Sequence, residues 1–158
     1  MIKALILDRD GLINHGSKDL SSPFYYICDY DDLVLKPNIY TAFYLLEVLR
    51  KKNKLKVILA TRQKCISKGL VGRLGVDNIN DRLQNEINFV FDGIYVEEKE
   101  DSKENIFNKI AKDLDIAPKN LLVIDDSGVE TDAAYRLGFQ SEYSSDLYHS
   151  ICKIFQIQ

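Results

Sequence analysis

Short runs of apolar residues that end abruptly in a polar side chain constrain the fold of this chain more than any other feature. Three such runs span residues 4–7, 57–60 and 121–124, and they are followed by Asp8, Thr61 and Asp125. Runs that are apolar at every position are typical of strands buried on both faces of a parallel sheet. We therefore expect these segments to form the centre of such a sheet.

Between the strands, apolar residues recur three and four positions apart, as on one face of a helix. Ser102 is the expected N-cap of one of these helices, and Gly138 is expected to close another. The mixed pattern of 64–88 predicts short helices. The expected helices span 38–52, 102–114, 129–137 and 147–155, and the further expected strands span 93–96 and, on an edge, 140–143.

This alternation of strands and amphipathic helices predicts an α/β fold. The expected architecture is a Rossmann-like, doubly wound sandwich of three layers with a mainly parallel sheet. The length of the chain, 158 residues, suits one hydrophobic core. Residues 1–158 are therefore expected to form a single domain.

Composition argues against several classes of protein. A net charge of -3 gives no broad attraction to nucleic acid or anionic membranes, and no apolar run approaches the ~20 residues of a membrane span. The three cysteines and two histidines do not form a zinc-binding pattern, and the first eight residues lack the features of a signal peptide. We expect a cytoplasmic protein with reduced thiols and neither a nucleic-acid nor a membrane partner.

Residues with useful chemistry gather at the ends of the expected strands. In open α/β sheets the functional crevice lies outside the carboxyl ends of the strands. Carboxylates that meet there repel one another, and a divalent cation relieves the repulsion; Mg²⁺ is the usual choice beside a phosphate. Taken singly, each aspartate is as readily a turn residue, but their joint position favours a site. The residues are Asp8, Asp10, Thr61, Arg62, Gln63, Asp125 and Asp126.

The order of these residues resembles the four motifs of the haloacid dehalogenase (HAD) superfamily. Residues 8–11, Asp-Arg-Asp-Gly, resemble its motif I, and residues 125–130 resemble its acidic motif IV. Thr61 is similar to the motif II threonine. Lys103 is similar to the motif III lysine and has the more suitable spacing to motif IV, although Lys99 is the alternative.

The resemblance is nearest to the heptose-bisphosphate and histidinol-phosphate phosphatases, known as the HAD IIIA branch. Residues 8–14 are close to the signature DRDGxIN of that branch, and residues 61–63 echo its TNQ segment. The branch often carries a zinc loop with cysteine and histidine ligands, but the matching residues 96–101 contain neither. We therefore do not infer the substrate of this chain from the substrates of that branch.

The resemblance implies a phosphatase that hydrolyses a phosphate monoester through an aspartyl-phosphate. Asp8 would be the nucleophile and Asp10 the general acid and base, while Thr61 and Lys103 would hold phosphoryl oxygens. The implied Mg²⁺ ligands are Asp8, the backbone carbonyl of Asp10, Asp125 and Asp126. The candidate substrate contacts are Arg9, Gly11, Arg62 and Gln63.

HAD proteins usually gain specificity from a cap, but the segment 12–36 is short, so we expect a minimal cap or none. Such an open site suits a small phosphorylated metabolite and also admits a bulkier phosphorylated substrate. Two alternatives stay open: a non-catalytic binding or regulatory protein on a HAD fold, and a phosphotransferase with an acceptor other than water. A response-regulator receiver is disfavoured because its acidic pair follows the first strand, whereas here the pair comes last.

Overall fold

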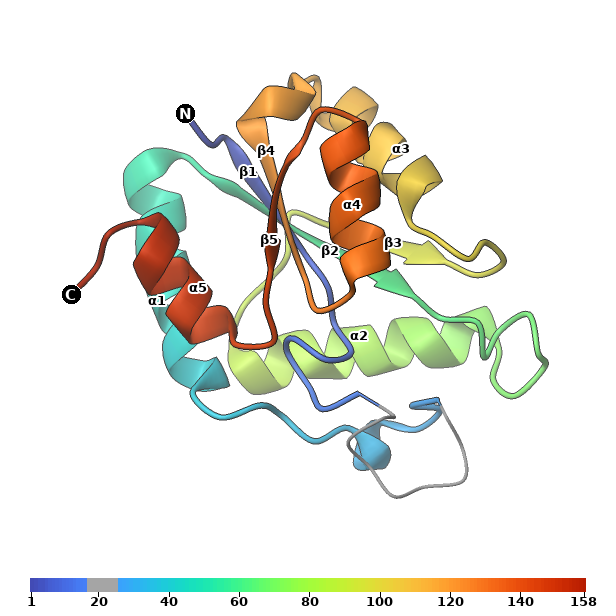
Figure 1. The fold of residues 1–158 in the computed structure, drawn as a ribbon. Coiled ribbons are helices and arrows are strands. Elements are labelled where there is room, and N and C mark those ends of the chain that lie inside the picture. The colour runs from blue at the N-terminus through green and yellow to red at the C-terminus, as the bar shows by residue number, and fades with distance from the viewer. Residues whose placement is uncertain (17–25) are drawn as a thin grey trace.

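A five-stranded, wholly parallel sheet forms the centre of the computed structural model, which describes residues 1–16 and 26–158 (Figure 1). The strand order is β3-β2-β1-β4-β5. This arrangement confirms the expected doubly wound α/β fold, including an edge strand near the C-terminus. The strands are β1 (Ala4–Leu7), β2 (Lys56–Arg62), β3 (Gly93–Glu97), β4 (Leu121–Asp125) and β5 (Gln140–Tyr143).

Helices cover both faces of the sheet and give the three layers (Figure 1). One face packs against α1 (Ile39–Asn53), α2 (Arg73–Ile87) and α5 (Leu147–Ile154). The other face packs against α3 (Glu104–Leu114) and α4 (Gly128–Arg136).

The central strand shows why its run of residues is wholly apolar. Leu5 and Leu7 point into the core beneath α1, while Ala4 and Ile6 point into the core beneath α3. All four are at most 1% exposed. Because successive side chains of a strand face opposite sides of the sheet, a strand covered on both sides has no position that favours a polar residue.

The segment 64–88 differs from its prediction. It contains one helix of 15 residues, α2, in place of several short ones. The buried face of α2 carries Val76, Ile79, Leu83 and Ile87, but the intervening polar residues and Gly75 weaken the pattern in the sequence. Tertiary packing of that apolar face stabilises α2, although the helix propensity of its residues is modest.

The start of α3 also differs slightly from its prediction. Lys103, not Ser102, occupies the N-cap position, and the Ser102 hydroxyl accepts a hydrogen bond from the backbone N–H of Glu104 at 3.0 Å. Ser102 thus binds a backbone N–H group of the first turn from the position that precedes the N-cap.

Few additional elements surround the carboxyl end of the sheet in the described parts of the chain. The segment 12–36 contributes a short 3-10 turn, Tyr30–Asp32, although its residues 17–25 lie outside the described ones. Between β2 and β3 the structure has α2 and no further helix or strand. No helix among the described residues has the length and apolar character to cross a membrane.

The register of the central strands places the ends of β1 and β4 side by side. Leu7 pairs with Leu59 of β2 and with Ile124 of β4, and the backbone N–H of Asp8 donates to the Ile124 carbonyl at 3.1 Å. The chain order reverses between β1 and β4, so Asp8 and Asp125 meet at the switch point where open α/β sheets bind ligands.

The second core predicts a large effect of one substitution. Phe107 of α3 is fully buried and lies edge-on to Phe139, with ring centroids 6.0 Å apart. Phe107→Ala should lower the free energy of unfolding by about 3–5 kcal/mol, because it removes buried contacts and leaves a cavity. Urea denaturation measures the change, with Tyr135→Ala, at a position 76% exposed, as the control. A loss below about 1 kcal/mol would contradict the packing of α3 on this face.

Candidate active site

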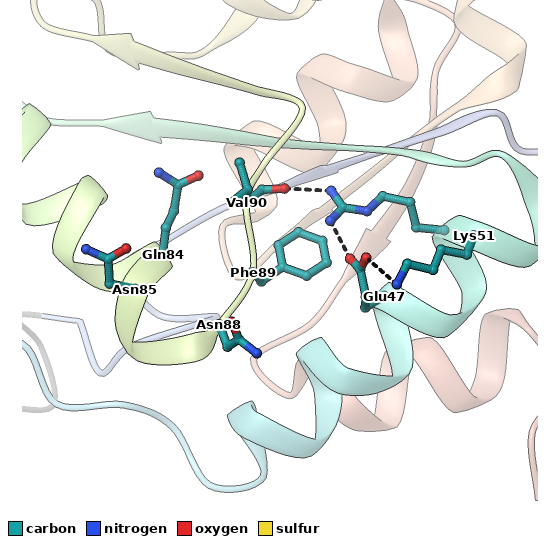
Figure 2. A pocket seen from close by; sticks show the side chains of 8 residues that line it. Glu47, Lys51, Gln84, Asn85, Asn88, Phe89 and Val90 are labelled. Carbon is teal, nitrogen blue, oxygen red and sulfur yellow. Dashed lines mark hydrogen bonds and ion pairs between the residues drawn. The ribbon is translucent and has the colours of Figure 1, made fainter.

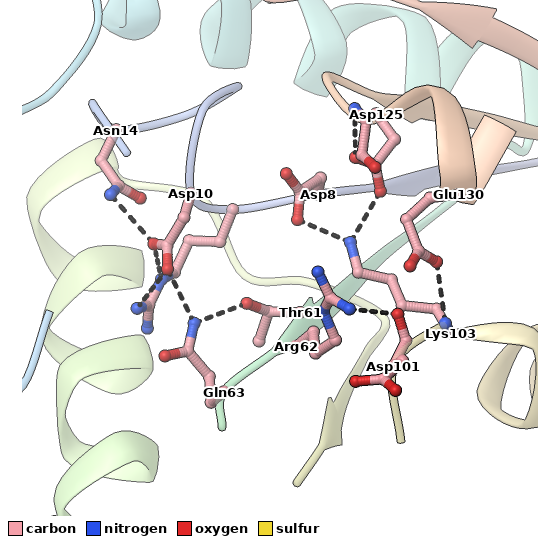
Figure 3. Close-up of polar contacts among 12 residues, drawn as sticks. Asp8, Asp10, Asn14, Thr61, Arg62, Gln63, Asp101, Lys103, Asp125 and Glu130 are labelled. Atoms are coloured by element: carbon pink, nitrogen blue, oxygen red, sulfur yellow. Dashed lines mark hydrogen bonds and ion pairs between the residues drawn. The ribbon is translucent and has the colours of Figure 1, made fainter. Parts of the chain in front are cut away.

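A buried lysine joins two aspartates from different strands (Figure 3). The Lys103 ammonium donates to Oδ1 of Asp8 at 2.6 Å and to Oδ2 of Asp125 at 2.7 Å. All three residues are at most 7% exposed. Lys103 reaches this position from the start of α3, while the alternative, Lys99, is exposed on the preceding loop. The structure thus brings Lys103, and not Lys99, to motif I.

Asp126 adds a third carboxylate to this cluster. One oxygen each from Asp8, Asp125 and Asp126 lie within 4.8 Å of one another. Gly11 permits the close approach: its φ of +97° suits glycine, and a Cβ on it would lie 1.9 Å from Oδ2 of Asp126. The predicted ligand Asp10 contributes no side chain to the group, which agrees with a role through its backbone carbonyl.

The close approach of these carboxylates affects the pKa of Asp8. Burial raises the pKa of Asp8 well above its ordinary value, and the carboxylates of Asp125 and Asp126 add to the rise, which Lys103 opposes. The Lys103 ammonium contacts two of these three carboxylates. A divalent cation that prefers oxygen ligands fits this donor set, because it would offset the remaining repulsion.

Asp10 lies outside the cluster and has its own set of partners. Its Oδ1 accepts from Arg9 Nε at 2.9 Å and from Asn14 Nδ2 at 3.0 Å, and its Oδ2 accepts from Gln63 Nε2 at 3.0 Å (Figure 3). Burial alone would raise the pKa of Asp10, but the Arg9 guanidinium and these hydrogen bonds bring it below its ordinary value. The ionised form, which can accept a proton from water, is thus favoured.

The residues at the carboxyl end of β2 divide between the interior and the surface. Thr61 and Gln63 are 1% exposed, and Gln63 Nε2 also donates to the Thr61 hydroxyl at 2.8 Å. Arg62 is exposed and donates to the backbone carbonyl of Asp101. Of the expected substrate contacts on this strand, Arg62 alone is exposed.

Arg9 does not lie where a substrate contact was expected. Its side chain is completely buried, and the guanidinium binds Asp10 and the amide oxygen of Asn80. Arg9 and Gln63 both donate hydrogen bonds to the Asp10 carboxylate, so each holds that side chain in place.

Two further residues at the site were not predicted. Asn80 of α2 is 2% exposed, and Glu130 of α4 accepts from the backbone N–H of Lys103 at 2.8 Å. Burial raises the pKa of Glu130. Asn80 could have been noticed in the sequence, because it is a polar residue at a position on the apolar face of its helix. Glu130 stood within motif IV, but sequence spacing does not reveal its contact with the start of α3.

A hollow elsewhere in the molecule lacks such converging groups. It has a volume of about 370 Å³ and lies between α1 and the end of α2 (Figure 2). Its charged lining side chains pair with one another, Arg50 and Lys51 both with Glu47. Arg50 also stacks on the Phe89 ring, 4.1 Å from its centroid. Because its charged side chains already bind one another, we interpret this hollow as a structural feature and not as a ligand site.

Comparison with solved structures identifies the fold. No family model matches the sequence, and no curated protein sequence matches it significantly. D,D-heptose 1,7-bisphosphate phosphatase of B. bronchiseptica, in complex with magnesium and phosphate, superposes with a TM-score of 0.77 and 19% identity, over 99% of this chain and 100% of that one. The chain has a HAD-like fold.

Further solved structures superpose less closely. D,D-heptose 1,7-bisphosphate phosphatase of Burkholderia thailandensis gives a TM-score of 0.58 at 24% identity, over 87% of this chain and 74% of that one. A HAD-superfamily hydrolase of subfamily IA from Geobacter sulfurreducens gives 0.63 at 13% identity, over 89% and 88%. At these identities the likeness concerns the fold.

The repulsion among the carboxylates at this end of the HAD fold predicts an effect on stability. Because the pKa of Asp8 is raised in the folded state, the folded protein retains a proton that the unfolded chain loses, so ionised Asp8 opposes folding above about pH 4. Asp8→Asn should therefore raise the melting temperature in EDTA at pH 7, by ~2–4 °C for each kcal/mol gained.

Differential scanning fluorimetry measures this change, and the gain should shrink towards pH 4. Asp81→Asn, at an exposed position of α2, is the matched control and should leave the melting temperature unchanged. A lower melting temperature for Asp8→Asn at pH 7 would show that the ion pair with Lys103 outweighs the repulsion.

Proposed function

We propose that this protein is a Mg²⁺-dependent phosphatase that hydrolyses a phosphate monoester through an aspartyl-phosphate on Asp8. The observation that carries the proposal is the buried contact of Lys103 with Asp8 and Asp125, with Asp126 alongside and Asp10 held separately two residues further on. The superposition on a phosphatase complexed with magnesium and phosphate supports it.

In the first half of the reaction, an oxygen of Asp8 attacks phosphorus and the bond from phosphorus to the leaving oxygen breaks. Asp10 donates a proton to that oxygen, so that the product leaves as an alcohol. The incoming phosphoryl dianion favours the protonated form of Asp10, because like charges repel. Lys103 and the Thr61 hydroxyl hold phosphoryl oxygens and stabilise the charge of the transition state.

In the second half, a water molecule attacks phosphorus while Asp10 accepts its proton. The bond between phosphorus and Asp8 breaks, which releases inorganic phosphate and restores the carboxylate. The lowered pKa of Asp10 suits this step, since the base must be ionised. One aspartate thus serves as acid and then as base.

The carboxylates of Asp8, Asp125 and Asp126, with the backbone carbonyl of Asp10, would hold Mg²⁺. When bound, the ion offsets the repulsion between the phosphate dianion and the nucleophilic carboxylate. Gly11 keeps the space beside Asp126 open for this arrangement.

The proposed substrate is a small phosphorylated metabolite that is handled in the cytoplasm. The exposed Arg62 lies beside the site and is the candidate contact for the part of the substrate beyond the phosphoryl group. A bulkier phosphorylated substrate is compatible with the few elements that the described residues place around the site.

The proposal predicts Mg²⁺-dependent release of phosphate from a generic aryl phosphate. EDTA should abolish the activity, and Asp8→Asn and Asp10→Asn should each lower kcat by at least ~10²-fold, because they remove the nucleophile and the proton-transferring group. Phosphate release in a steady-state assay is the measurement. Asp132→Asn, at an exposed position of α4, is the matched control and should retain full activity.

Three results would overturn the proposal or redirect it. Activity retained in Asp8→Asn would exclude the assigned nucleophile. Absence of turnover by the wild type across a broad panel of phosphate esters would favour a binding protein on the HAD fold. Transfer of the phosphoryl group to an added alcohol in preference to water would favour a phosphotransferase.

A further inference from the structure

The Arg9 guanidinium links the Asp10 carboxylate to helix α2. Arg9 Nε donates to Oδ1 of Asp10 at 2.9 Å, and its Nη1 donates to Oδ1 of Asn80 at 2.8 Å. Arg9 is 0% exposed, so water does not compete for these bonds. A guanidinium bound at both ends has little freedom to rotate and fixes the carboxylate that it contacts.

Asn80 is an unusual residue for its position. It lies on the buried face of α2, between Ile79 and Leu83, where an apolar side chain would ordinarily pack. Its amide nitrogen is buried without a hydrogen-bond partner among the described residues, and such a group costs roughly 1–3 kcal/mol of stability. Packing alone therefore does not account for this residue.

The orientation of the Asn80 amide follows from its partner. Arginine has donors and no acceptor, so Asn80 must present its oxygen to Arg9. The contact is thus specific for a side chain with an acceptor at this distance. Leucine has nearly the same shape and lacks that acceptor.

Four hydrogen bonds hold the Asp10 carboxylate, two on each oxygen. Its Oδ1 accepts two hydrogen bonds, from Arg9 and Asn14, at 2.9 and 3.0 Å. Its Oδ2 accepts one at 3.0 Å from Gln63 and a long contact of 3.4 Å from Arg9 Nη2. Each oxygen thus accepts two hydrogen bonds, and Oδ2, which accepts the longest of the four, is held less tightly than Oδ1.

We propose that Asn80 is a positioning residue, which acts through Arg9 to hold the Asp10 carboxylate in the orientation that proton transfer requires. This inference rests on the proposed function, since it assigns Asn80 to the acid and base of that reaction. Helix α2, which contains none of the recognised motifs, thus contributes a residue on which the rate of the proposed reaction depends.

The test compares Asn80→Leu with wild type on an aryl phosphate, p-nitrophenyl phosphate, in the presence of Mg²⁺. Its good leaving group needs little help from an acid, whereas hydrolysis of the aspartyl-phosphate needs the base in every case. We expect kcat to fall by ~10–100-fold, because small misplacement of a catalytic group has effects of this size. KM should fall together with kcat.

A pre-steady-state burst separates positioning from general damage. Slow hydrolysis of the aspartyl-phosphate should make p-nitrophenol appear rapidly, in an amount equal to the enzyme, before the slow steady state. A misfolded fraction would lower the rate without a burst. Asn80→Asp, which keeps the acceptor, should restore most of kcat, and Asn78→Leu, at an exposed position of the same helix, is the matched control.

A second measurement does not depend on turnover. In ¹⁵N-labelled wild type, the Arg9 Nε–H proton should exchange slowly with solvent, and in Asn80→Leu it should exchange much faster. Wild-type kcat in Asn80→Leu, or loss of activity without a burst, would overturn the positioning role, as would an Arg9 signal that stays protected. If the wild type hydrolyses no phosphate ester, the proposed function fails, and the exchange measurement still decides whether Asn80 holds Arg9.

Discussion

The convergence of three aspartates beside a buried lysine, at the end of the sheet, is the constraint on which the rest of the site depends. Asp8, Asp125 and Asp126 are brought within 4.8 Å of one another, and Lys103 contacts the first two. Such an arrangement opposes folding, as the raised pKa of Asp8 indicates. Its persistence is understandable under the proposed function, in which a divalent cation offsets the repulsion among the carboxylates.

The topology of the sheet explains why these residues meet. The central strand β1 lies between β2 and β4, and its register aligns the end of motif I with the end of motif IV. Lys103 approaches from the start of α3, which Glu130 fixes through the backbone N–H of Lys103. Asp10 is held by a separate group of buried polar side chains, so the two aspartates of motif I have different electrostatic environments.

The parallel sheet and the aspartates at its carboxyl end could be predicted from the sequence because both depend on local patterns. A run that is apolar at every position indicates a strand covered on both faces, and the aspartate after it marks the end of that strand. The sequence could not indicate that Arg9 is buried, because its partner Asn80 is 71 positions away and is contributed by a helix whose pattern was weak. Long-range pairing of this kind decides which side chains of the site are exposed and which hold others in place.

Chemical trapping of the aspartyl-phosphate tests the central claim most directly. Wild-type protein is mixed with Mg²⁺ and an aryl phosphate, quenched and reduced with borohydride, which converts an aspartyl-phosphate into homoserine, and the peptides are analysed by mass spectrometry. The account predicts homoserine at position 8, more abundant in Asp10→Asn than in wild type because the base for its hydrolysis is absent. Phosphate release with homoserine at another position, or with none in either protein, would contradict it.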